Sequence, residues 1–383
     1  MTAVVGQASE QDISVLYSRD ARHVLPVKPV EARQKPHEAL QLFGMFLCNS
    51  FDEARALSNV IIFWEQIPKF AAEHLNNAAG DVPNDYVMEF SLGDRPAKLT
   101  LFPGTYYPNK KGAPPKRRFP GVKEQAVEQA LIQQACVKGE EQTVNGHTSY
   151  FVSFTINSLA RTLKQMGSTM SNTQIREALE VLSSSVMTVE YGDDLINDNR
   201  ETILPRFDRN KQSRFSGNNG DDLWRVKLHD LIAHAIQNVT YKQFPFAAMK
   251  NYSPPGAFLL RRMHFIKSNV SEVAPYVFKL TEIKRLTAGL NHVRLASSLA
   301  MLKKELDKMV GDGLLESYDV ENVFPERRPR GRPVPIDYDI TLYPGREWIK
   351  NMKAGAVRMS VSERRLGLPR SARQQRQLTL PTF

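Results

Sequence analysis

The same order of predicted elements occurs twice along the chain, and this repeat constrains the fold more than any other feature of the sequence. The order is a leading helix, a strand, a pair of helices, a strand, a polar loop and a final strand. The first copy is predicted at 122–137, 150–154, 155–182, 186–191 and 223–228, and the second at 256–268, 275–280, 281–289, 292–310, 314–320 and 337–343. This is the order of a winged helix, so the repeat predicts an α+β protein with two tandem winged-helix domains.

The repeat and the composition of the flanking segments divide the chain into five parts. They are a flexible N-terminal arm (1–40), an N-terminal extension with a basic linker (41–121), two winged-helix domains (122–245 and 246–345) and a basic C-terminal tail (346–383). The linker is rich in proline and glycine, which is typical of an exposed connection. We expect its basic residues Lys116, Arg117 and Arg118 to lie against phosphates.

The helix pair of the first copy has the pattern of a helix-turn-helix. Ser171 and Gln174 fit a capping box, in which the serine hydroxyl caps the helix and the glutamine reaches back. The apolar stripe of the second helix consists of Ile175, Leu179 and Leu182. The residues left on the outer face of its first turn are Asn172, Thr173 and Arg176, which we expect to contact base edges in the major groove. A helical hairpin that only fills a core is the alternative interpretation.

The second copy carries its own candidates for DNA contact. Its long helix has an apolar stripe at Leu295, Leu299, Leu302, Leu306 and Met309. We expect His292, Arg294 and Ser298 to reach bases from this helix. The loop between the last two strands contains Arg327, Arg328, Arg330 and Arg332, hereafter the loop arginines. Their charges predict contact with a DNA backbone or minor groove, and a solvated loop that aids solubility is the alternative.

The charge balance indicates a polyanionic partner. The chain has 51 basic and 41 acidic residues, which gives a net charge of +10, and its pI is near 9.4. This excess does not by itself distinguish nucleic acid from a membrane surface. No run reaches the roughly 18 apolar residues of a membrane-spanning helix, and the N-terminus lacks a secretory signal. Only Cys48 and Cys136 occur, so we expect a cytoplasmic protein without a disulfide framework.

The sequence contains no pattern that indicates an enzyme or a cofactor. It has no G-x-x-x-x-G-K-[S/T] phosphate loop, and no two of its eight histidines are separated by a single residue. His229 and His234 have the wrong spacing to share a helix face, so a metal pair is disfavoured. The paired aspartates at 193–194 and 221–222 lie in Asn- and Gly-rich sequence that is typical of solvated turns.

With these features together, the chain resembles the plasmid replication initiators of the Rep type, in their RepA/TrfA-like branch. The resemblance is carried by LSNVIIFWEQIPKF (57–70), by SLARTLKQMGSTMSNTQIREALEVL (158–182) and by GAFLLRRMHFIK (256–267) with the helix pair after it. It implies binding of repeated origin sites, local strand opening, recruitment of a host helicase or its loader and of polymerase, and a switch between dimer and monomer. A winged-helix transcriptional repressor is the alternative, since a repressor needs only its operator.

The C-terminal residues resemble a second known motif. Gln377, Leu378 and Leu380 occur in QLTLP, which is similar to the peptides by which bacterial proteins dock in the sliding clamp of the replicative polymerase. In that resemblance Gln377 is the polar anchor, and the two leucines are apolar anchors. Packing of these residues on the protein's own surface is the alternative.

Overall fold

The structure, a computed structural model, describes most of the chain. The described residues are 25–26, 40, 43–44, 47–48, 56–77, 81–92, 95–108, 112–144, 147–191, 200–210, 222–238, 241–266, 275–287, 289–290, 292–325 and 334–365. Most of the predicted arm at 1–40 lies outside this set, as do the four loop arginines and the residues after 365.

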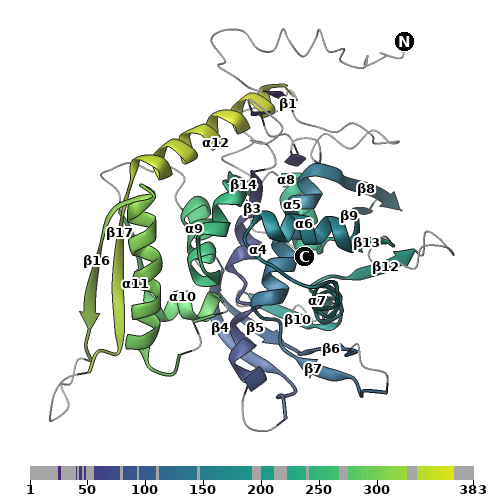
Figure 1. The fold of residues 1–383 in the computed structure, drawn as a ribbon, viewed down its shortest axis with the longest axis horizontal. Coiled ribbons are helices and arrows are strands. Elements are labelled where there is room, and N and C mark those ends of the chain that lie inside the picture. The colour runs from purple at the N-terminus through teal and green to yellow at the C-terminus, as the bar shows by residue number, and fades with distance from the viewer. Residues whose placement is uncertain are drawn as a thin grey trace.

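Helices and strands occur together along the described chain (Figure 1). The helices are α4 (Ile62–Gln66), α5 (Val122–Lys138), α6 (Ile156–Gln165), α7 (Asn172–Ser184), α8 (Asp230–Asn238), α9 (Pro254–Ile266), α10 (Leu280–Leu286), α11 (Leu295–Gly311) and α12 (Arg346–Arg365), with the 3-10 helices η2 (Ala71–Asn77) and η3 (Phe246–Asn251). The strands are β1 (Leu25–Pro26), β2 (Leu47–Cys48), β3 (Ser58–Ile61), β4 (Tyr86–Leu92), β5 (Arg95–Leu101), β6 (Gly104–Tyr106), β7 (Lys116–Arg118), β8 (Gly139–Val144), β9 (His147–Thr155), β10 (Val186–Tyr191), β11 (Glu201–Thr202), β12 (Arg206–Asn210), β13 (Leu223–Lys227), β14 (Tyr241–Phe244), β15 (Tyr276–Lys279), β16 (Leu315–Val323) and β17 (Asp337–Pro344). This mixture fits the predicted α+β class.

The second copy of the predicted order is present in full. It consists of α9, β15, α10, α11, β16 and β17 in that sequence. The three strands form an antiparallel sheet in the order β15-β17-β16, so the last strand lies between the other two. On the left of Figure 1, α11 runs alongside β16 and β17. Leu302, Leu306 and Met309 of its apolar stripe are fully buried, which holds the helix against this sheet.

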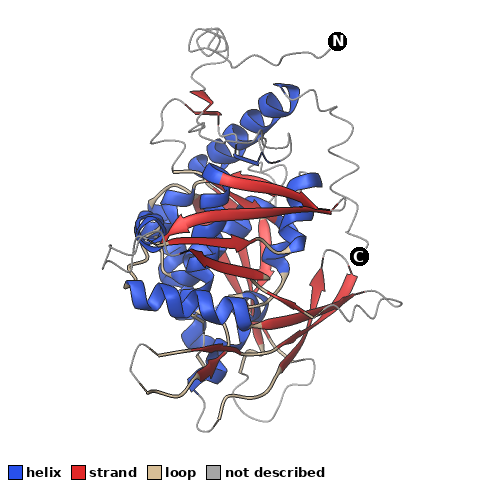
Figure 2. Ribbon diagram, turned by 90° about the vertical axis from the view of Figure 1, so that its right-hand side faces the viewer, coloured by secondary structure: helices blue, strands red, loops and turns tan. Residues whose placement is uncertain are grey.

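The first copy has the predicted helices, but its strands pair differently from the prediction. Helices α5, α6 and α7 and strand β9 lie where the sequence places them. However, β10 does not pair with β13: β10 lies between β5 and β11, whereas β13 lies between β9 and β12. The sheet β12-β13-β9-β8 is seen with its strands running across the molecule in Figure 2. The first copy therefore lacks the strand pairing of a winged helix, because two other strands supply partners, β5 from the extension and β12 from the polar insert.

The extension shares two sheets with residues of the first copy. Strand β5 joins β10, and β3 pairs with β14, so two sheets connect residues on either side of position 121. The segment predicted as an exposed linker forms the β6–β7 hairpin. One continuous apolar core contains Trp64 from the extension, Leu159 from the first copy, Leu302 from the second and Trp348 from α12. Therefore, the predicted basic tail begins with a helix anchored in the core.

Candidate nucleic-acid interface

The first turn of α7 is held by the predicted capping box. The Ser171 hydroxyl accepts a hydrogen bond from the Gln174 backbone N–H at 3.2 Å, and Gln174 Oε1 accepts one from the Ser171 N–H at 2.9 Å. Gly167, with φ of +85°, ends α6 in a conformation that favours glycine. Residues within this helix pair therefore determine where α6 ends and where α7 begins.

The outer face of α7 presents the residues expected to contact bases. Ile175 and Leu179 are fully buried and fix the rotation of the helix. As a result, Asn172 is exposed, and Thr173 and Arg176 are partly exposed. The Nε atom of Arg176 is shielded from solvent, so only the outer part of this side chain faces outward. Base contact by these three residues remains a prediction.

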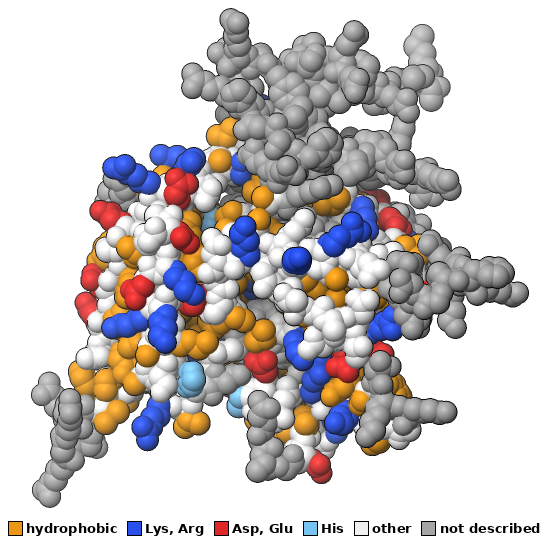
Figure 3. Space-filling view, viewed as in Figure 1, with side chains coloured by type: hydrophobic (Ala, Val, Ile, Leu, Met, Phe, Trp, Pro, Cys, Tyr) orange, Lys and Arg blue, Asp and Glu red, His pale blue; other side chains and the backbone are white. Residues whose placement is uncertain are grey.

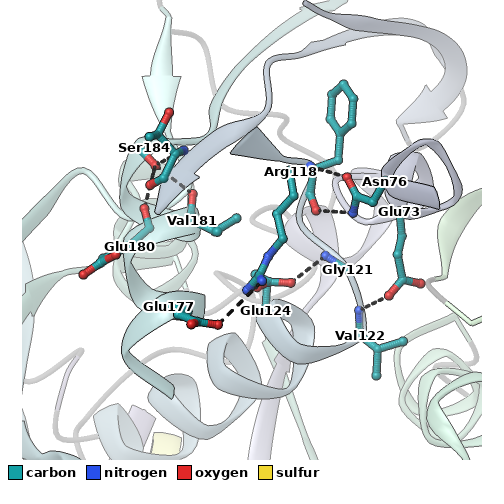
Figure 4. A network of polar contacts seen from close by, with 12 residues as sticks. Glu73, Asn76, Arg118, Gly121, Val122, Glu124, Glu177, Glu180, Val181 and Ser184 are labelled. Atoms are coloured by element: carbon teal, nitrogen blue, oxygen red, sulfur yellow. Dashed lines mark hydrogen bonds and ion pairs between the residues drawn. The ribbon is translucent and has the colours of Figure 1, made fainter. Parts of the chain in front are cut away.

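The β6–β7 hairpin covers another side of α7. The Thr105 N–H donates to the Ser184 hydroxyl at 2.8 Å, and the Tyr107 N–H donates to Glu180 Oε2 at 2.9 Å. Figure 4 shows Glu177, Glu180 and Ser184 along this side of the helix. The hairpin therefore covers a different side of α7 from the face that carries Asn172 and Arg176.

Arg118 has a different position from the one predicted. Its guanidinium lies 2.6 Å from Glu124 Oε1 and 3.9 Å from Glu177 (Figure 4). The guanidinium also stacks over the Tyr106 ring at 4.4 Å. Two carboxylates thus balance its charge, and only 18% of its side chain is exposed. The expected phosphate contact does not fit this location, because the arginine links the hairpin to α5 and α7 instead.

The neighbouring basic residues of the hairpin face outward. Lys116 and Arg117 are both exposed, and Arg117 Nη1 donates to Asn84 Oδ1 at 3.1 Å. They remain candidates for contact with phosphates.

The residues predicted around α11 divide into two groups. His292 and Arg294 are exposed just before the helix, where the Lys284 ammonium donates to the His292 carbonyl at 2.6 Å. Ser298 has no exposed surface, so the prediction that it reaches bases was wrong. It lies four residues before the buried Leu302 and therefore shares the core-facing side of the helix. The adjacent Ser297 is exposed instead.

Several exposed basic residues border the two helix pairs and were not predicted. Arg161 and Lys164 lie on α6, Lys250 lies on η3, and Lys303 and Lys304 lie on α11. A side chain at position 167 would clash with the backbone of Lys250, so the turn of the first helix pair lies directly against η3. The space-filling view shows Lys and Arg side chains spread over this face, with acidic side chains between them (Figure 3). Only the folded arrangement brings Lys250 to this turn.

The strand that leads to the arginine-rich loop is acidic on its outer face. Glu316, Asp319 and Glu321 of β16 are exposed. Like charges disfavour the approach of DNA to this strand. The loop arginines, and the clamp-like residues Gln377, Leu378 and Leu380, lie outside the described residues.

Within the described part of the chain, two classes of site are not found. No three His, Cys, Asp or Glu side chains are grouped so that they could hold a metal ion. No helix there is both long enough and apolar enough to cross a membrane.

Comparisons with known proteins give weak similarities. No protein-family model matches the sequence, and no curated protein matches it significantly. Among solved structures, domains 2 and 3 of RctB as the selenomethionine derivative are 12% identical with a TM-score of 0.38, covering 73% of this chain and 99% of that one. A second structure of RctB domains 2–3 is 14% identical with a TM-score of 0.38, covering 70% and 95%. The Pi initiator protein in complex with iteron DNA is 11% identical with a TM-score of 0.36, covering 59% and 92%. At these TM-scores, the likeness is too weak to establish a common fold or function.

Proposed function

We propose that this chain is a sequence-specific double-stranded-DNA-binding replication initiator that reads repeated origin sites with two helix pairs, the second of them in a winged helix, and catalyses no reaction. The observation that carries the proposal is the architecture of residues 254–344. There, a helix pair precedes a two-stranded hairpin whose last strand joins the first strand of the unit, in the order β15-β17-β16. This is the arrangement of a winged helix, in which the second helix of the pair enters the major groove.

The first copy supports the same proposal with its own helix pair. A capped helix, α7, begins with exposed polar side chains and is braced from behind by a hairpin. The chain thus has two helix pairs and a net charge of +10, which favours binding to a long DNA site with two half-sites.

The test starts with the full-length chain and a pool of random duplexes. Selection should yield one bipartite sequence, and Arg176→Ala should reduce the preference for it over random duplex by about 5- to 150-fold, equivalent to roughly 1–3 kcal/mol. Arg161→Ala, an exposed arginine on α6, is the matched control and should weaken both duplexes equally. If Arg176→Ala also weakens both equally, Arg176 contacts only phosphate.

Origin opening distinguishes an initiator from the alternative, a transcriptional repressor. Supercoiled DNA carrying repeats of the selected site beside an A+T-rich segment should become permanganate-reactive at its thymines when the protein binds. Binding without such reactivity would favour the repressor. We further propose that the initiator recruits a host helicase or its loader, that it switches between dimer and monomer, and that Gln377, Leu378 and Leu380 dock in a sliding clamp.

A further inference from the structure

Residues 58–77, hereafter the bridging segment, lie between the first unit, which contains α5–α7, and the second unit, which contains α9–α11. The segment comprises β3, α4 and η2. Helix α5 of the first unit and helix α9 of the second both pack on β3, and α10 of the second unit packs on η2. Figure 1 shows β3 and α4 in the centre of the molecule, with the two units on either side. The bridging segment therefore contacts both units.

Glu65 of the bridging segment contacts both units at once. Its Oε1 atom accepts a hydrogen bond from Gln129 Nε2 of α5 at 2.7 Å, and its Oε2 atom lies 3.4 Å from Arg261 Nε of α9. These three residues are no more than 5% exposed. A charge-assisted contact in such a place is strong and has a defined geometry. One buried carboxylate thus ties the leading helix of one unit to the leading helix of the other.

Glu73 makes a second connection of the same kind. Its Oε1 atom accepts from the backbone N–H of Val122, the first residue of α5, at 2.9 Å. Its Oε2 atom accepts from the backbone N–H of Gly289, between α10 and α11, at 3.2 Å. Figure 4 shows the carboxylate aimed at Val122. A carboxylate is favoured at the start of a helix by the helix dipole.

Two glycines make room for this connection. A side chain at Gly121 would overlap the Glu73 carboxylate, so only glycine admits it here. Gly289 has φ of +93°, a conformation that strongly favours glycine, and it directs its N–H to Glu73. Gly289 lies five residues before Arg294, which occupies the N-cap position of α11. Helix α5 packs on α6 and α7, so Glu73 connects the supports of both proposed base-reading helices.

We propose that Glu65 and Glu73 are positioning residues that hold α7 and α11 in one relative orientation and thereby set the spacing between the DNA half-sites. The spacing role rests on the proposed function, whereas the clamping of the two units does not. One inserted base pair moves a half-site by about 3.4 Å and turns it by about 35°. A clamped pair of units cannot follow this displacement.

The first experiment measures the clamp without DNA. Nitroxide labels are attached at Lys164→Cys on α6 and Lys303→Cys on α11, two exposed positions, with Cys48 and Cys136 replaced by Ala. Double electron–electron resonance should give a narrow distance distribution with Glu73 present and one about twofold broader in Glu73→Ala. Glu305→Ala is the matched control, because Glu305 also accepts a backbone N–H, from Ser253 at 2.9 Å, within a single unit. Its distribution should stay narrow.

A conservative variant keeps the test valid if Glu73→Ala does not fold. Glu73→Gln retains one acceptor oxygen and should give an intermediate width, and it replaces Glu73→Ala if the latter does not unfold cooperatively. Equal, narrow distributions in the Glu73 variants and in the protein with Glu73 would overturn the clamp.

The second experiment tests spacing on the selected bipartite site. One inserted base pair should weaken DNA binding by the wild type on the order of tenfold or more. The same insertion should weaken DNA binding by Glu73→Gln by clearly less. The two proteins should have the same affinity for an isolated half-site. Equal losses in both proteins would refute the spacing role while leaving DNA reading intact. If the wild type selects no bipartite site, the proposed function is refuted instead. The distance measurement with nitroxide labels would still test whether Glu73 holds the two units together.

Discussion

A buried histidine makes the stability of this protein sensitive to acid in a way that can be measured directly. His264 of α9 has no exposed surface, and its Nδ1 atom lies 2.7 Å from the Leu260 carbonyl, which requires a proton on Nδ1. Burial, with a smaller contribution from the charge of Lys242, lowers the pKa of His264 to about 4, against 6.5 for an ordinary histidine. The folded protein therefore holds this ring neutral.

The sign follows from proton binding in the two states. Between pH 6.5 and 4 the unfolded chain binds a proton that the folded chain does not, so stability falls as the pH falls through this range. The full shift of 6.5 − 4 = 2.5 pH units corresponds to about 3 kcal/mol. Between pH 7 and pH 5 the loss from this one group is about 2 kcal/mol.

The assay is urea unfolding followed by tryptophan fluorescence at pH 7 and pH 5. His264→Phe keeps a ring of similar size and removes the titration, so its stability should fall by about 2 kcal/mol less than that of the wild type on acidification. The exposed His292→Gln serves as the control and should behave as the wild type. The same pH dependence in His264→Phe and the wild type would refute the reasoning.

Glu128 provides a test of opposite sign. Burial raises the pKa of its carboxyl, although the nearby Lys69 ammonium opposes the shift. The folded state therefore holds this proton more strongly than the unfolded state, and stability is lost as the pH rises through the raised pKa. Glu128→Gln should accordingly change the pH dependence in the direction opposite to His264→Phe.

Three further predictions concern the surface and the C-terminus. Arg118→Ala should reduce the free energy of unfolding by roughly 2–4 kcal/mol, because it leaves the Glu124 carboxylate buried without its cation, and it should not alter the salt dependence of DNA binding. If Arg118→Ala lowered the slope of log K against log[salt], Arg118 would be shown to contact phosphate. Changing the four loop arginines to Gln should flatten that slope by roughly three units, since each phosphate neutralised contributes about 0.9, and an unchanged slope would exclude the loop from the interface. The peptide 371–383 should bind purified sliding clamp saturably at micromolar concentration, and the same peptide with Gln377→Ala and Leu380→Ala should not; equal binding of both would reject the clamp interpretation.

Local signals in the sequence were sufficient for the helices of the two repeated copies, but they did not indicate α8 or α12. Ser171 and Gln174 specify where α7 begins, and the leucines of α11 specify which side is buried, because both depend on residues three or four positions apart. The same rule could have excluded Ser298, which lies within the apolar stripe of α11.

Pairing between distant strands could not be read from the sequence. Periodicity identifies β10 as a strand but does not indicate that its partner is β5, and the polar sequence RFDRN of β12 has no strand pattern. The β6–β7 hairpin is rich in basic residues and borders a proline-rich connection, so it was interpreted as a linker. Its role depends on Glu124, Glu177 and Glu180, which only the folded chain brings near it.

The pairing of β5 with β10 sets the order in which the first unit can be completed during synthesis. Leu101 of β5 lies opposite Met187 of β10, and 187 − 101 = 86 residues separate them. At about 5–20 residues per second, a ribosome takes roughly 4–17 s to add this length of chain. Throughout that time the β4–β5 hairpin has an open edge, which is a template for pairing with another chain. The nascent protein is therefore most prone to aggregate before β10 emerges, and slow translation between these strands should lower the yield of soluble protein.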